Sequence, residues 1–403
     1  MPVADRGDGA EHDLRTILRI QAIRAFLYGL GSVLIGVTLA DGGLTDAQVG
    51  LIFTAILIGM ALGSLVVGTV GERLGRRRVY VAMLLLVGAA GTVFAFTLSL
   101  PALIGASLTG ALSTDPNESG PITSLEQAMI GEAPPATRLS VFGRYNAIAY
   151  LAGAVGALAA SLPGLLAFGE QRFLLTYPVL SAVAAALAAR MSSAVEARHG
   201  TDTADVRAPR SRAPLVRSRG IVLRLASLFA LDSFAGGFVV QSFVVYWFER
   251  TFGASTEVMG VVFFASGLLQ AGSSIAASRI AARFGLLNTM VFTHLPSNAL
   301  LMVVPLAPTL WLAVVLWLTR VSISQMDVPA RQAYVVALVD PEERVAASAY
   351  TNTARYVSRP IGPAVAGSLM QTATAAPFFI AGGLKIVYDV LIYATFRRVR
   401  LPS

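Results

Sequence analysis

The chain has 403 residues, of which 55% are hydrophobic and 13% are charged, and its mean hydropathy is +0.68. Soluble domains carry about 25% charged residues, so this composition excludes a water-soluble globular protein and indicates a membrane protein. The formal net charge is +8, and the sequence has no cysteine, which excludes a disulfide framework and a thiolate metal site.

Twelve apolar segments are long enough to cross a bilayer, because a spanning helix needs about 20 mostly apolar residues. The sequence therefore predicts an all-α membrane protein with twelve transmembrane helices. The first segment has no small-residue cleavage site behind it and is expected to be retained. The predicted helices cover residues 17–40, 49–71, 79–99, 101–131, 139–168, 173–192, 221–248, 257–278, 285–306, 309–338, 345–370 and 376–396.

Most arginines lie on one side of this predicted topology. Of 30 arginines, 22 lie at the termini or in loops that join an even-numbered helix to the next one, and only Arg172 and Arg250 lie in the opposite loops. The positive-inside rule then predicts that both termini lie in the cytoplasm. The expected location is the plasma (inner) membrane, which the protein crosses several times. The basic charge is interpreted as topology; the alternative is contact of the basic loop with anionic lipid or nucleic acid.

A polar stretch separates six predicted helices from six more. The predicted division is an N-terminal six-helix bundle (1–192), a cytoplasmic linker (193–219) and a C-terminal six-helix bundle (220–403). The halves repeat in sequence, which predicts pseudo-symmetric bundles. The matching pairs are Gly50 and Gly260, Arg73 and Arg283, and Gly75 and Gly285 at a spacing of 210, then Arg138 and Arg344, Asn146 and Asn352, and Gly156 and Gly362 at 206. We assign the difference in spacing to an insertion in the fourth helix.

The residues from Gly68 to Arg77 form a short cationic turn between the second and third predicted helices. This turn, a glycine, an acid–arginine pair, a glycine and two basic residues, resembles the loop between helices 2 and 3 of the major facilitator superfamily, in its drug-exporter-like bacterial branch. Glu72 replaces the usual aspartate. The resemblance implies a transport site between the halves, lined by helices 1, 4, 7 and 10. It also implies a cytoplasmic gate made of Gly68, Glu72, Arg73, Gly75, Arg76 and Arg77, with Arg355 and Arg359 as partners. The alternative is a purely topological basic turn.

Several ionisable side chains fall inside the predicted helices. A charge at the bilayer centre costs about 2.5 to 3.5 kcal/mol, so such residues are expected to face a cavity or a partner. Helices 4 and 10 are equivalent in the repeat, and prolines interrupt both, which is typical of a transport site. The predicted substrate- and proton-coupling residues are Asp115, Glu118 and Glu126 in helix 4, Asp232 in helix 7, and Arg320, Asp327 and Arg331 in helix 10.

We predict that Asp232 pairs with Arg320 in one state, and that protonation of Asp232 or Glu118 releases the pair and couples proton flow to movement of the halves. Glu126 and Arg331 both precede Gln-Ala, so these opposite charges are expected to face each other across the cavity. The alternative for Asp327 and Arg331, spaced i,i+4, is a structural pair within one helix. His294 is expected to be a hydrogen-bonded helix residue and not a ligand.

The predicted function is proton-coupled export of a small amphiphilic molecule by a monomer, with alternating access and without a metal or cofactor. The sequence departs from drug exporters in two places. Residues 153–157 have alanine where the exporter motif has proline, and residues 104–110 lack an arginine. The alternatives are a proton-coupled metabolite importer and, in another class, a membrane receptor or structural protein that does not transport. An enzyme is not predicted, since no nucleophile, base and orienting group occur at recognisable spacing.

Overall fold

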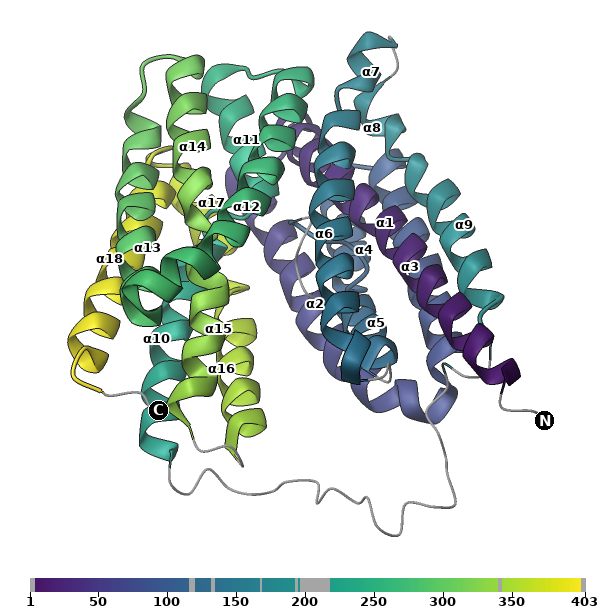
Figure 1. Cartoon of the computed structure of the whole chain (residues 1–403). Coiled ribbons are helices and arrows are strands. Elements are labelled where there is room, and N and C mark those ends of the chain that lie inside the picture. Colours follow the sequence, from purple (N-terminus) through teal and green to yellow (C-terminus); the bar gives the residue numbers. More distant parts are fainter. Residues whose placement is uncertain are drawn as a thin grey trace. The chain divides into compact units, whose positions relative to one another are not determined.

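A computed structural model gives the structure of the chain (Figure 1). It describes residues 4–115, 120–131, 135–166, 169–192, 195, 218–339 and 343–399. Every regular element in these ranges is a helix, which confirms the predicted all-α class.

Contacts divide the helices into two compact units, each described separately. The first unit spans Met1–Arg198 and Val240–Leu268, and the second spans His199–Val239 and Leu269–Ser403. Nearly all of the predicted linker lies outside the described residues, and the predicted bundle boundaries stay a prediction. The segment from Val240 to Leu268 follows that linker in sequence but packs with the first unit.

The first unit contains ten complete helices among its described residues. They are α1 (Ala4–Asp41), α2 (Asp46–Leu74), α3 (Arg76–Phe96), α4 (Leu100–Leu108), α5 (Pro121–Gly131), α6 (Pro135–Ala159), α7 (Leu162–Leu165), α8 (Glu170–Phe173), α9 (Thr176–Ala189) and α11 (Gln241–Phe252). The helix α12 (Thr256–Phe284) begins in this unit and ends in the second.

The described part of the second unit is also helical. Its elements are α10 (Arg219–Gly237), α13 (Leu286–Val303), the short 3-10 helix η2 (Val304–Leu306), α14 (Leu310–Ser324), α15 (Asp327–Leu338), α16 (Arg344–Ser358), α17 (Ile361–Met370) and α18 (Ala376–Phe396). In this unit α10 packs against α16 and α18, and α13 packs against α14, α15 and α18.

Nine helical segments within the described ranges are long and apolar enough to cross a membrane. The other three predicted helices, the fourth, tenth and eleventh, are each split into two shorter helices: α4 and α5, α14 and α15, α16 and α17. Pro121 and Pro329 lie in the first turns of α5 and α15, where a helix needs no donor N–H. Pro121 is thus the first residue of α5 and Pro329 the third residue of α15, and the helix breaks before them confirm the predicted interruptions of helices 4 and 10.

The second half of α1 is buried on nearly all sides, which is expected of a helical segment that is apolar all round. The helix packs against α6, α9 and α11, and its residues from Leu27 to Leu39 are buried. On α2, by contrast, Leu62, Leu65 and Val66 are more than half exposed. Such apolar side chains need lipid around them.

Glycines bring helices into backbone contact in both units. A Cβ on Gly156 would lie 2.0 Å from the carbonyl oxygen of Phe26, so α6 touches α1 along the backbone. A Cβ on Gly362 would lie 2.6 Å from Cα of Gly237, so α17 touches α10 in the same manner. Small residues permit such close approach of membrane helices. Gly156 and Gly362 are predicted repeat partners, and the structure gives them the same packing role.

Gly156→Ala is expected to lower the melting temperature, because the added methyl group must push α1 and α6 apart. Overpacking costs about 1–3 kcal/mol, whereas alanine otherwise favours a helix over glycine by roughly 0.5–1 kcal/mol. Gly272→Ala in α12 is the matched control, since its Cβ would meet nothing within 4 Å. Thermal unfolding of both variants in detergent, followed by fluorescence or light scattering, should show a lower melting temperature for Gly156→Ala and a higher one for Gly272→Ala. A Gly156→Ala protein as stable as the parent would contradict the contact.

Candidate functional site

Charged side chains gather in a buried cluster in each unit. The Glu126 cluster, in the first unit, comprises Arg24, Tyr80, Glu126 and Tyr145. The Asp232 cluster, in the second unit, comprises Asp232, His294, Asp327, Arg331, Lys385 and Asp389.

Glu126 on α5 accepts hydrogen bonds from three helices. Arg24 on α1 donates to Oε2 at 2.7 Å, and so does the phenol of Tyr145 on α6 at 2.5 Å. The phenol of Tyr80 on α3 donates to Oε1 at 2.7 Å. Glu126 is 0% exposed, so these donors replace the water that would otherwise solvate its carboxylate.

Asp232 on α10 is held by two cations. Lys385 on α18 donates to Oδ1 at 2.6 Å, and Arg331 on α15 donates to Oδ2 at 3.2 Å. Arg331 also lies 3.3 Å from the carboxylate of Asp327, one turn earlier on α15. Asp232 is 4% exposed, so it is buried together with its partners.

A histidine extends the Asp232 cluster to a further carboxylate. The Nδ1 atom of His294 on α13 lies 2.8 Å from Oδ1 of Asp389 on α18, and its Nε2 atom lies 3.9 Å from Oδ1 of Asp232. Asn298 on α13 donates to Oδ2 of Asp389 at 2.9 Å. The hydrogen-bonded role predicted for His294 is confirmed.

The two clusters contain equivalent ion pairs with reversed charges. Glu126 and Arg331 each precede Gln-Ala and lie in the second part of a broken helix, the predicted fourth in one half and the tenth in the other. Each pairs with the first predicted helix of its own half, Glu126 with Arg24 and Arg331 with Asp232. Each charge thus has an opposite charge as partner inside its own unit, and the expectation that Glu126 and Arg331 face each other across a cavity stays a prediction.

The predicted partner of Asp232 also differs. Arg331, which follows the break between α14 and α15, takes the place expected for Arg320. The guanidinium of Arg320 instead lies over the ring of Trp317, 4.9 Å from its centroid. The alternative of an i,i+4 pair between Asp327 and Arg331 is present, because Pro329 lies in the first turn of α15 and leaves the helix intact.

Asp115 lies just before the residues that separate α4 from α5. Its Oδ1 accepts the backbone N–H of Gln241 at 2.9 Å, and the carbonyl of Thr114 accepts that of Ser242 at 3.1 Å. These bonds satisfy donors at the start of α11, so Asp115 acts as a helix cap supplied from another segment. Glu118 lies outside the described residues, and a coupling role for either acid stays a prediction.

The predicted gate is described only in part, because the side chains of Gly68, Glu72 and Arg73 lie outside the described set. Gly75 joins α2 to α3 with φ 92°, and Gly285 joins α12 to α13 with φ 85°. This left-handed backbone favours glycine, and it occurs at both predicted repeat positions.

The remaining gate residues contact neighbours within their own units. Arg77 donates to the carbonyl of Met191 at 2.8 Å, and Arg76 is half-buried. Arg355 and Arg359 are half-buried at the end of α16, where the carbonyl of Arg355 accepts the hydroxyl of Ser233 at 2.9 Å. Their docking with the turn stays a prediction.

Sequence reasoning missed five members of the clusters, the phenols Tyr80 and Tyr145 and the charged residues Arg24, Lys385 and Asp389. Each charged residue lies in a predicted apolar helix, so the rule that identified Asp232 applies to these three too. The strongest signal is Lys385, the only lysine in the sequence, with Asp389 one turn later on the same helix.

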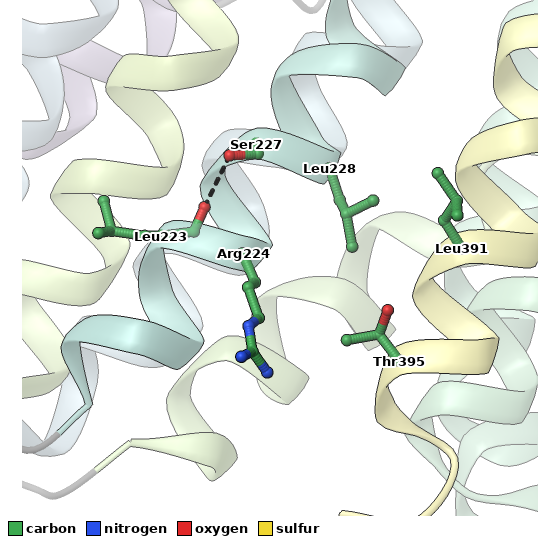
Figure 2. Close-up of a pocket in the computed structure, with 6 residues that line it drawn as sticks. All are labelled: Leu223, Arg224, Ser227, Leu228, Leu391 and Thr395. Carbon is green, nitrogen blue, oxygen red and sulfur yellow. Dashed lines mark hydrogen bonds between the residues drawn. The ribbon is translucent and has the colours of Figure 1, made fainter.

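A separate surface cavity of about 560 Å³ lies between α10 and α18 (Figure 2). Its lining residues are Leu223, Arg224, Ser227, Leu228, Leu391 and Thr395. One charged side chain, Arg224, lines this cavity, and no member of the Asp232 cluster does. The hydroxyl of Ser227 in the cavity wall donates to the carbonyl of Leu223 on the same helix, α10. The buried clusters are therefore the candidate functional site.

Comparison with known proteins covers almost the whole chain. A family model described as Major Facilitator Superfamily matches residues 20–363 and 230–403. An uncharacterized membrane protein of Saccharomyces cerevisiae, YJR124C, is 25% identical over 426 residues, which cover 96% of this chain and 94% of the yeast protein.

Solved transporter structures share the fold at low sequence identity. The nucleoside transporter NupG has a TM-score of 0.73 and 14% identity, with 96% of this chain and 99% of that chain covered. A D-xylose-proton symporter has a TM-score of 0.71 and 15% identity, with 94% and 97% covered. A bacterial homolog of the human lysosomal transporter Spinster has a TM-score of 0.68 and 15% identity, with 98% of both covered. These likenesses support a multi-pass membrane fold of twelve helices in two bundles.

Removing one side of the Arg24–Glu126 pair is expected to destabilise the protein by about 3–5 kcal/mol, because the other charge is left buried without its partner. Arg24→Met combined with Glu126→Gln should cost clearly less than the sum of the two single changes. Unfolding of the three variants in detergent gives the coupling energy.

The exposed pair of Arg15 and Glu11, 2.5 Å apart, provides the control. Glu11→Gln should change stability little, since exposed pairs contribute at most about 1 kcal/mol. Additive costs for Arg24 and Glu126 would show that the buried pair is not energetically coupled.

Proposed function

The chain belongs to the major facilitator superfamily, and we propose that it is a proton-coupled antiporter that exports a small amphiphilic molecule by alternating access. The family match and the transporter structures that share its fold support transport of a small molecule across a membrane. Coupling to protons and the outward direction of transport go beyond this support and are proposed here.

The observation that carries the proposal is the pair of buried carboxylates, each surrounded by donors from other helices. Glu126 is held by one guanidinium and two phenols, and Asp232 by one guanidinium and one ammonium. A purely structural membrane bundle has no need to bury these charges, whose insertion is costly. A carboxylate that gains a proton loses most of its attraction for such donors, which then become available to an anionic group of a substrate.

The proposal also assigns topology and a gate. The protein lies in the plasma (inner) membrane and works as a monomer. Both of its termini face the cytoplasm, as the distribution of arginines favours. The turn from Gly68 to Arg77 forms the cytoplasmic gate with Arg355 and Arg359. Asp115, Glu118, Arg320 and Asp327 belong to the coupling pathway around Glu126, Asp232 and Arg331.

Proton-coupled import of a metabolite is the second candidate. It is favoured by the D-xylose-proton symporter among the proteins that share the fold. At 15% identity that likeness concerns the fold alone, so the substrate and the direction are decided by measurement.

Reconstituted vesicles with an imposed pH gradient test the proposal directly. Compounds from a panel of organic cations, zwitterions and anions are added, and an internal pH-sensitive dye reports proton movement. Export predicts that a substrate collapses a gradient by moving against protons, whereas import predicts movement of substrate and protons together. A protein that gives no flux with any compound would favour a membrane receptor or structural protein.

Asp232→Asn is expected to abolish the proton-linked signal, because the neutral amide pairs only weakly with Lys385 and Arg331 and no longer links them to a proton. Glu11→Gln is the control, since this exposed acid lies outside both clusters. Size-exclusion chromatography establishes that both variants are folded. Unchanged flux in folded Asp232→Asn would remove Asp232 from the mechanism.

A further inference from the structure

We propose that His294 and Asp389 bind one shared proton, and that the imidazole of His294 links this proton to Asp232. This inference rests on the proposed function, because it identifies where a coupling proton is held. It moves the proton from Asp232 to a neighbouring pair on α13 and α18.

The imidazole lies between two carboxylates and faces each with a different nitrogen. Its Nδ1 atom is 2.8 Å from Oδ1 of Asp389, and its Nε2 atom is 3.9 Å from Oδ1 of Asp232. The amide of Asn298 holds the second oxygen of Asp389 at 2.9 Å, and the ring of Tyr388 packs edge-on against the imidazole. His294 is 6% exposed, Asp389 1% and Asn298 0%, so water contributes little to their solvation.

The partners of the two aspartates decide which of them needs the proton. Asp232 has an ammonium at 2.6 Å and a guanidinium at 3.2 Å, so its negative charge is well compensated. Asp389 meets one imidazole and one amide, and no arginine or lysine of the described chain lies within 4.0 Å of it. A buried carboxylate without a cation is costly, so a proton that makes His294 an imidazolium stabilises the His294–Asp389 pair.

The surrounding charges also favour a proton on the His294–Asp389 pair. Lys385 lies one turn before Asp389 on α18, yet its ammonium points to Asp232. The close partners of the cations Arg331 and Lys385 are Asp232 and Asp327, so the shared proton is the positive charge that lies next to Asp389. From α16, half-buried Arg355 adds a longer-range positive charge toward Asp232, and from α18 the phenol of Tyr388 completes the surroundings.

A second proton on His294 changes the partners of Asp232. When Nδ1–H points to Asp389 and Nε2 also gains a proton, a third cation faces Asp232 and competes with Lys385 and Arg331. Loss of that proton restores the two original pairs. Proton binding between α13 and α18 is thereby transmitted to the ion pair that joins α10 to α15.

The titration of His294 can be observed without a known substrate, because the chain has only three histidines. A His12→Gln/His199→Gln protein leaves His294 as the single imidazole signal in ¹⁵N-histidine NMR. The ring signals distinguish the singly from the doubly protonated form of this imidazole. Asp389→Asn should favour the singly protonated form of His294, since it removes the carboxylate that stabilises the imidazolium. Asp41→Asn, at an exposed acid outside the cluster, should leave the protonation form of His294 unchanged.

An imidazole that is never doubly protonated in the parent protein would overturn the proposal, and this result needs no variant of the cluster. An unchanged protonation form of His294 in folded Asp389→Asn would also overturn it. In the vesicle assay, Asp389→Asn should lose proton-linked flux and Asp389→Glu should recover part of it; full flux in Asp389→Asn would contradict the coupling role. Absence of flux from the parent protein contradicts the proposed function, whereas the titration still decides whether the proton is shared.

Discussion

Buried carboxylates that need donors from several helices are the constraint on which the rest of this structure depends. Glu126 joins α5 to α1, α3 and α6, and Asp232 joins α10 to α15 and α18. Each carboxylate loses its hydration on burial, and hydrogen bonds from all its donors are needed to offset the free-energy cost. A change in one donor or one proton therefore alters the balance among several helices at once.

Broken helices place one charge of each pair. The irregular backbone after α4 and after α14 allows α5 and α15 to begin at new positions, and these short helices carry Glu126 and Arg331. The partner charge lies on the first predicted helix of the same half, at Arg24 or Asp232. The repeat thus preserves the location of an ion pair while the signs of its two charges are exchanged, because attraction requires opposite charges and not a particular order.

Element positions were largely predictable from the sequence, whereas side-chain partners were not. The predicted helix 376–396 coincides with α18, and the prolines in helices 4 and 10 indicated their interruptions. The break at Pro360 between α16 and α17 was missed, although proline carries the same signal there. The buried positions of Glu126, Asp232 and Arg331 followed from the cost of charge in a membrane. Their partners depend on which helix faces meet, a property that hydropathy does not encode, so the sequence favours Arg320 as the partner of Asp232 whereas the structure pairs Asp232 with Arg331 and Lys385.

The chemistry of the donors separates the roles of the two clusters. Around Glu126 the donors are a guanidinium and two phenols, groups that ordinarily keep their protons at neutral pH. That cluster therefore has a fixed pattern of donors and is suited to holding helices in place. The Asp232 cluster contains an imidazole, whose ordinary pKa of about 6.5 makes it the side chain that changes charge near neutrality. A proton-dependent change in helix contacts is thus expected to originate in the second unit, at the histidine that lies between two aspartates.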